Sequence, residues 1–184
     1  MNRLASPAQL RASLLRWSLF LVPLTMLLGY LSGQVAGSAA DNPWFTQLAK
    51  PDIYPPPIVF PIVWTALYFM MGLAFAMVCA AWGARWRVLA IIAFLIQFVL
   101  NLAWSPIFFA QHDIGLALAV ILALDITLLG TVFLFWKVRV AAAVLLLPYL
   151  AWVLFASVLN WQFLQANPYA ENLPADNPVQ EFVL

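Results

Sequence analysis

The sequence runs IVFPIVWTALYFMMGLAFAMVCAAW from Ile58 to Trp82 without one charged residue. A helix of about 20 apolar residues crosses the hydrocarbon core of a bilayer, so this run is long enough to span a membrane. The rest of the chain shares its character, because 66% of the 184 residues are hydrophobic and 8% are charged, with a mean hydropathy of +0.96. The composition therefore predicts an integral membrane protein.

Five apolar runs in all predict membrane-spanning helices, at residues 17–40, 58–82, 88–110, 114–136 and 140–164. Short turns join the last four, which predicts that consecutive helices are antiparallel neighbours. The fold class is thus an all-α membrane protein, a five-transmembrane-helix bundle of residues 17–164. A basic N-terminal segment, 1–16, precedes it, and an acidic C-terminal tail, 165–184, follows it. The proline-rich loop 41–57 should be extended and lie outside the hydrocarbon.

Positive charges divide unequally between the two ends of the predicted bundle. One end carries Arg3, Arg11, Arg16, Arg85, Arg87, Lys137 and Arg139, and the other carries only Lys50. By the positive-inside rule, the N-terminus is cytoplasmic and the C-terminus periplasmic in a bacterial inner membrane. The first run also fits a cleaved secretory signal peptide, although it is longer than a typical signal core. The net charge of +1 argues against nucleic acid as a partner.

The sequence has few of the residues and motifs that catalysis or metal binding requires. His112 is the only histidine and Cys79 the only cysteine, and there is no nucleophile elbow or phosphate-binding loop. We therefore expect neither a metal site nor an enzyme. Asp125 lies near the middle of a predicted span, where an ionised carboxylate costs at least about 2.5 kcal/mol. It is either a functional acid, or a neutral carboxyl hydrogen-bonded to a neighbouring helix through Thr127 or a backbone carbonyl.

Aromatic and polar residues recur at helical spacing on three of the predicted spans. They are Trp64 and Tyr68 on the second span, Asn101, Trp104, Ser105 and Phe108 on the third, and Tyr149, Trp152, Ala156 and Asn160 on the fifth. Flat rings with a few amides and hydroxyls suit the lining of a pocket for a planar, mostly apolar ligand. The alternative is ordinary helix packing with Asn101 and Asn160 as interhelical hydrogen bonds, and spacing alone favours it.

Four motifs shift that balance, because together they resemble the translocator protein family, also called the tryptophan-rich sensory protein or peripheral-type benzodiazepine receptor family. The motifs are WF…LAKP…YPP at 44–56, FPIVWTALY at 60–68, NLAWSPIFF at 101–109 and PYLAW…LNW at 148–161. They occur in the right order, and the resemblance covers residues 17–164. It implies a five-helix bundle, usually dimeric, with a cavity for porphyrins and other flat hydrophobic molecules. Loop 41–57 is implied to be the lid of that cavity.

By motif position, the resemblance implies nine ligand-binding residues: Phe45, Pro55, Pro56, Trp64, Tyr68, Asn101, Trp104, Trp152 and Ala156. Porphyrin or haem is the implied ligand, and no cofactor is obligatory. Animal members bind a sterol through a segment with Tyr and then Arg where this chain has Trp161 and Gln165, so a sterol is less well supported. The implied role is sensing or transport. The alternatives are oxidative breakdown of a bound porphyrin, or modulation of partner membrane proteins without a small ligand.

The first predicted span also carries a run of small residues. Gly29, Gly33 and Gly37 form two overlapping GxxxG motifs, a spacing that lets another helix approach closely in lipid. Either a helix of the same bundle or a second copy of the chain could fill this groove. The implied homodimer leads us to expect the second copy.

Overall fold

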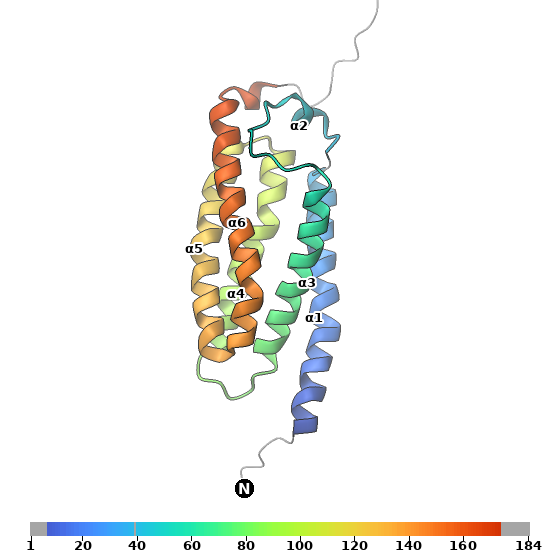
Figure 1. Cartoon of the computed structure of the whole chain (residues 1–184), viewed down its shortest axis with the longest axis vertical. Helices are drawn as coiled ribbons and strands as arrows, with labels where there is room; N and C mark the ends of the chain where they lie inside the picture. Colours follow the sequence, from blue (N-terminus) through green and yellow to red (C-terminus); the bar gives the residue numbers. More distant parts are fainter. Residues whose placement is uncertain (1–6, 39, 174–184) are drawn as a thin grey trace, which may run out of the picture.

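The computed structural model describes residues 7–38 and 40–173, and in these residues it is a bundle of five long helices without strands (Figure 1). The long helices are α1 (Pro7–Ala36), α3 (Val59–Cys79), α4 (Arg87–Ser105), α5 (Ile114–Val138) and α6 (Val140–Ala166). Three short ones are α2 (Pro43–Gln47), a π-helix η1 (Pro106–Ala110) and a 3-10 helix η2 (Ala170–Asn172). All five long helices are apolar enough to cross a membrane, with α4 and η1 forming one span. The predicted fold class is confirmed.

Two predicted segments differ from the observed elements. The first helix begins at Pro7 rather than at residue 17, so Arg11 and Arg16 of the basic N-terminal segment are helical. Hydropathy marks the part of a helix that lies in lipid, and a helix can continue beyond it. The loop 41–57 is not extended throughout, since α2 forms inside it. Asn42 caps α2 by accepting the Phe45 N–H, and Pro43 occupies the first turn, where no N–H is needed.

The long helices form a closed ring in the order α1, α3, α6, α5, α4. Each contacts the next extensively, and η1 with α4 completes the ring against α1. The consecutive helices α3 and α4 are joined by the stacked rings of Phe75 and Phe94, although the backbone of α3 packs more extensively against α6. A loop of seven residues, 80–86, lets α4 start away from α3.

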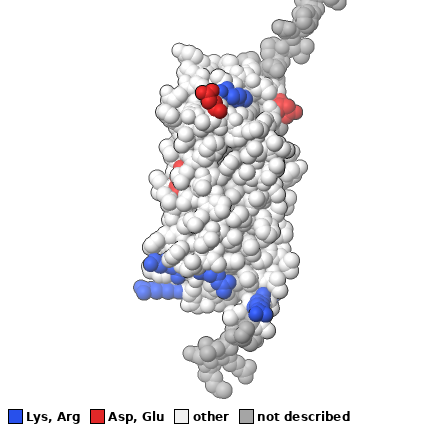
Figure 2. Space-filling view, in the orientation of Figure 1, with Lys and Arg blue, Asp and Glu red and all other residues white. Residues whose placement is uncertain are grey.

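The two ends of the bundle differ in charge. Figure 2 shows Lys and Arg side chains gathered at the end that holds the α3–α4 loop, opposite the end covered by α2. Arg87 is fixed there, because its guanidinium donates to the Cys79 carbonyl at 2.9 and 3.1 Å and stacks over the Trp82 ring. This end, called the basic end below, also has a solid core. Phe94 stacks on Phe75 with ring centroids 4.0 Å apart.

Most of the predicted tail lies outside the described residues. Its first part is ordered, since α6 continues to Ala166 and η2 follows, with Ala170 buried against the loop. Nothing in the sequence of this segment predicted that contact.

Candidate functional site

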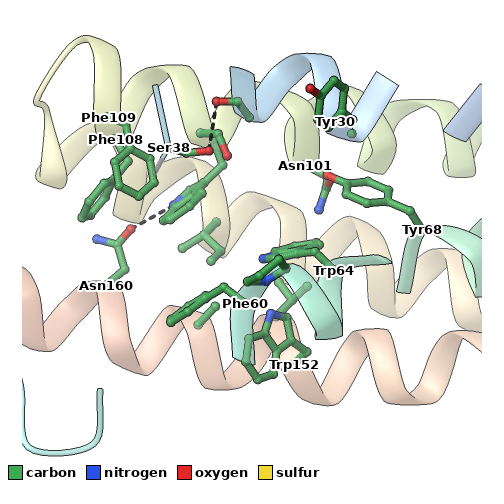
Figure 3. A pocket seen from close by; sticks show the side chains of 18 of the residues that line it. Tyr30, Ser38, Phe60, Trp64, Tyr68, Asn101, Phe108, Phe109, Trp152 and Asn160 are labelled. Atoms are coloured by element: carbon green, nitrogen blue, oxygen red, sulfur yellow. Dashed lines mark hydrogen bonds between the residues drawn. The ribbon is translucent and has the colours of Figure 1, made fainter. Parts of the chain in front are cut away.

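The half of the bundle beneath α2 encloses a cavity of about 820 Å³. Side chains from every long helix and from the loop line it (Figure 3). Seven of the nine residues implied by the resemblance are among them: Phe45, Trp64, Tyr68, Asn101, Trp104, Trp152 and Ala156. Pro55 and Pro56 do not line the cavity, and their neighbours Tyr54 and Pro57 do. The motif located this part of the loop but not the residues that face inward.

Aromatic rings form the wall on α3 and α6. Trp64 stacks on Tyr68, one helical turn away, with centroids 5.4 Å apart and 30° between the planes. Phe60, one turn in the other direction, meets Trp152 of α6 edge-on at 5.9 Å. Figure 3 shows Phe60, Trp64 and Trp152 grouped on one side of the cavity and Tyr68 with Asn101 further along it. Wide, flat surfaces therefore face the empty space.

Two amides hold the wall together. The Tyr68 hydroxyl donates to Asn101 Oδ1 at 2.9 Å, which joins α3 to α4. The Trp104 indole N–H donates to Asn160 Oδ1 at 3.0 Å, and Asn160 Nδ2 donates to the Ile114 carbonyl at 3.1 Å. Both sequence interpretations of the amides therefore hold at once, because Asn101 and Asn160 line the cavity and also serve as interhelical hydrogen bonds.

The π-helix η1 supplies the cavity's end wall. Pro106 lacks an N–H, and the chain after it widens so that the Gln111 N–H reaches the Pro106 carbonyl five residues back, at 3.0 Å. Phe108 then stacks on Trp104 at 5.1 Å, and Phe109 lines the cavity beside it. The predicted span 88–110 thus contains a break in regular α-helix that places two rings at the site.

The run of glycines on α1 and just after its end faces the cavity. Gly29, Gly33 and Gly37 all line it, and a Cβ at Gly29 would collide with the Tyr68 ring. Closer to the basic end, where α1 also packs on α3, Gly72 of α3 lies against the Val22 backbone of α1. Tyr68 of the same chain therefore fills the groove at Gly29, whereas no other helix of the described residues packs on Gly33 or Gly37, and the expectation of a second copy there stays a prediction. A dimer remains a prediction, with no interface placed by this feature.

The loop covers the cavity through Phe45, whose ring contacts Tyr54, Phe109 and Phe163 at centroid distances of 5.3 to 6.0 Å. Lys50 lies over the same ring, with its ammonium 3.7 Å from the centroid, and it donates to the Phe45 carbonyl at the end of α2. Burial lowers the pKa of Lys50 and raises the pKa of Tyr54. Both shifts indicate that these two loop side chains are partly buried against the bundle.

Residues after α6 fasten the loop to the bundle. Asn167 donates to the Ala49 carbonyl at 3.1 Å and accepts the Ala49 N–H at 2.8 Å, a paired contact. The buried Trp44 donates its indole N–H to the Ala170 carbonyl at 2.9 Å and stacks on His112 at 4.5 Å. This C-terminal latch, residues 167–170, was missed from the sequence, where no motif links residues so far apart.

The cavity has no charged side chain among its lining residues. Its polar groups are neutral amides, hydroxyls and indoles, and no cluster of three potential metal ligands occurs within the described part of the chain. Phe60, Phe109 and Phe163 line it as well and were not predicted as site residues, although Phe163 continues the helical spacing of Ala156 and Asn160. Such a site can bind a flat apolar molecule by ring stacking.

Comparison with known proteins gives a consistent result. Residues 20–165 match the profile of the TspO/MBR family. The tryptophan-rich protein TspO of Chlorobaculum tepidum is 42% identical over 129 residues, 68% of this chain and 80% of the relative. The tryptophan-rich sensory protein of Cereibacter sphaeroides is 35% identical over 82% of this chain and 92% of its own length. The translocator protein of Bos taurus is 33% identical over 76% of this chain and 83% of its own length.

Proposed function

The chain belongs to the TspO/MBR family of membrane proteins, and we propose that it is a receptor or translocator that binds porphyrins and other flat hydrophobic ligands in the aromatic cavity. One observation carries this proposal. The space beneath the lid is about 820 Å³, within the range of small-molecule sites, and rings line it on several sides while no charge does. Relatives named as sensory and translocator proteins support a role in sensing or transport.

An apolar ligand would reach this cavity from the bilayer. Tyr30 of α1 and Thr65 of α3 both line the cavity and are exposed. The proposed entry route therefore lies between these two helices. A porphyrin dissolved in the membrane would enter without crossing water, and its ring would then stack on Trp64 and Trp152.

The proposal is tested by titrating the detergent-solubilised protein with protoporphyrin. Replacing Trp64 or Trp152 by Leu removes an aromatic stacking partner worth about 0.5 to 1.5 kcal/mol, so each change should weaken binding about 2- to 10-fold. Trp161→Leu is the matched control, because Trp161 lies on α6 but points outward and is half exposed. Unchanged affinity in the Trp64→Leu, Trp152→Leu double variant would exclude this cavity as the binding site.

The same titration separates the alternative functions. Products analysed after incubation in light and in dark would reveal oxidative breakdown of the bound porphyrin. Absence of binding by the wild type would instead favour a protein that modulates membrane partners without a small ligand.

We also propose that the basic end faces the cytoplasm, that the lid faces the periplasm of a bacterial cell, and that the protein is a homodimer. The charge asymmetry supports the orientation. Single cysteines at the exposed positions Arg85 and Asp52 test it with a membrane-impermeant thiol reagent, because the native Cys79 is buried. Labelling of Asp52→Cys in whole cells, and of Arg85→Cys only after the cells are opened, is expected. The reverse pattern would invert the topology.

A further inference from the structure

Asp125 is a buried carboxyl in the middle of α5 that the proposed binding site does not use. Its side chain is 7% exposed, and it does not line the cavity. Oδ2 lies 2.7 Å from the Ser157 hydroxyl of α6, and Oδ1 is buried without a partner. The predicted partner Thr127 turns instead to the Ala123 and Leu124 carbonyls of its own helix.

The Ser157 hydroxyl allows two arrangements of the proton shared with Asp125. This oxygen is 2.7 Å from Asp125 Oδ2 and 3.1 Å from the Val153 carbonyl oxygen, yet a hydroxyl has only one hydrogen to donate. If Asp125 were ionised, Ser157 would give its one hydrogen to Oδ2, and the Val153 carbonyl would keep only the backbone N–H of Ser157 that it accepts within α6. If the carboxyl carries a proton, Oδ2–H donates to Ser157 and Ser157 donates to Val153, so both contacts are hydrogen bonds.

The surroundings favour the protonated carboxyl. No Lys, Arg or His of the described residues forms an ion pair or a charge interaction with Asp125. From α6, the titratable group in electrostatic range is Tyr149, which is itself buried and donates to Gln97 of α4. An ionised carboxylate in the bilayer interior with a single hydrogen-bond donor would be strongly unfavourable. A neutral carboxyl leaves only a carbonyl-type oxygen, Oδ1, without a partner.

We propose that Asp125 is a proton-binding site inside the membrane, where the chain Asp125 to Ser157 to the Val153 carbonyl joins α5 to α6 directly behind the cavity wall. The placement gives the proton a structural role. Leu124 and Ala156, the residues before Asp125 and Ser157, both line the cavity. Loss of the proton would put a charge into the contact between α5 and α6 and weaken the wall that these helices form.

Infrared spectroscopy of the whole protein tests the protonation directly, because the carbonyl stretch of a protonated carboxyl is separate from the carboxylate bands. The other Asp and Glu residues in the described part of the chain, Asp41, Asp52, Asp113 and Glu171, lie outside the five long helices. Wild type at neutral pH should show one protonated-carboxyl band that Asp125→Asn abolishes and that Ser157→Ala shifts to higher frequency, since a hydrogen bond is lost. Asp113→Asn is the matched control, because Asn caps a helix as well as Asp does and the band should stay.

Identical wild-type and Asp125→Asn spectra in this region would overturn the proposal. Because an Asn amide can donate to Ser157 in the same geometry, Asp125→Asn should fold, and thermal unfolding in detergent verifies this. Should it not fold, the Ser157→Ala shift alone decides, and an unshifted band counts against the site. The second measurement is the thermal unfolding midpoint at increasing pH. At the pH where the protonated-carboxyl band disappears, the midpoint of the wild type should fall and that of Asp125→Asn should not. Equal falls in both proteins would refute the structural role of the proton. Neither readout requires a ligand.

Discussion

The two halves of the bundle use the same kind of residue in opposite ways. In the half at the basic end, Phe75, Phe94 and Phe135 stack with nearly parallel planes, centroids 4.0 and 5.9 Å apart, and fill the space between helices. In the half under the lid, Trp64 and Trp152 stand around a cavity of about 820 Å³. Aromatic content therefore does not by itself distinguish a packed core from a binding site.

Hydrogen bonds between polar side chains support the half of the bundle that contains the cavity. Tyr68 with Asn101, and Trp104 with Asn160, link α4 to α3 and to α6 across the bundle by hydrogen bonds. At the basic end small residues take over, since Ala142 and Ala143 are fully buried and let α6 approach its neighbours closely. One half is stabilised by contact area, and the other by a few directional bonds.

The largest expected effect is the removal of a ring from the filled half. Phe94 is 1% exposed and stacks on Phe75, Phe98 and Phe135, so Phe94→Ala should lower the free energy of unfolding by about 3 to 5 kcal/mol. Phe60→Ala, at the cavity wall, should cost less than about 2 kcal/mol, because the ring already borders empty space. Equilibrium unfolding in mixed micelles measures both. Equal losses would show that the cavity is filled in the membrane-bound protein.

A smaller effect is expected where the two halves meet, at the contact between α1 and α3. A Cβ at Gly72 would lie 2.7 Å from the Val22 Cα, and backbone cannot move aside as a side chain can. Gly72→Ala should therefore cost about 1 to 3 kcal/mol in the same unfolding measurement. Gly130→Ala is the control, since no atom lies within 4 Å of its Cβ and helix propensity should make the change neutral or stabilising. A neutral Gly72→Ala would mean that α1 is not seated against α3 as described.

The smallest effect concerns the lid and leaves both halves intact. Asn167→Ala removes both hydrogen bonds to Ala49, each worth about 1 kcal/mol, so the loop should open more often while the bundle keeps its stability. Hydrogen exchange at the Ala49 amide should quicken about tenfold or more, with exchange in α5 unchanged. Asn172→Ala, an exposed amide nearby, should leave the lid amides as protected as in the wild type. If both variants behave alike, the latch does not hold the lid.

The sequence predicted the five long helices well, because hydropathy reports directly on the part of a helix that lipid surrounds. It predicted the cavity residues through motifs, and those on regular helices, such as Trp64 and Asn101, do line the cavity. It failed on the loop, where Pro55 and Pro56 mark a turn but backbone path decides which side chains face inward. The helix α2 could have been found, since Asn42 followed by Pro43 is an N-cap with proline in the first turn.

Tertiary partners were beyond the sequence. The spacing of Gly29, Gly33 and Gly37 predicts close approach by another helix, and only the structure identifies the Tyr68 ring as the group that lies against Gly29. Likewise the position of Asp125 in a span predicts an interior partner, but not that the partner is Ser157 on another helix.

The C-terminal latch is synthesised long after the loop that it holds. The lid leaves the ribosome early, before four of the five helices that enclose the cavity, whereas Asn167 and Ala170 are made after the last of them. Until these residues are made, the lid lacks its hydrogen bonds to Asn167 and Ala170. The hydrogen bonds that fasten the cover of the cavity therefore form only when almost the last residues of the described chain are in place.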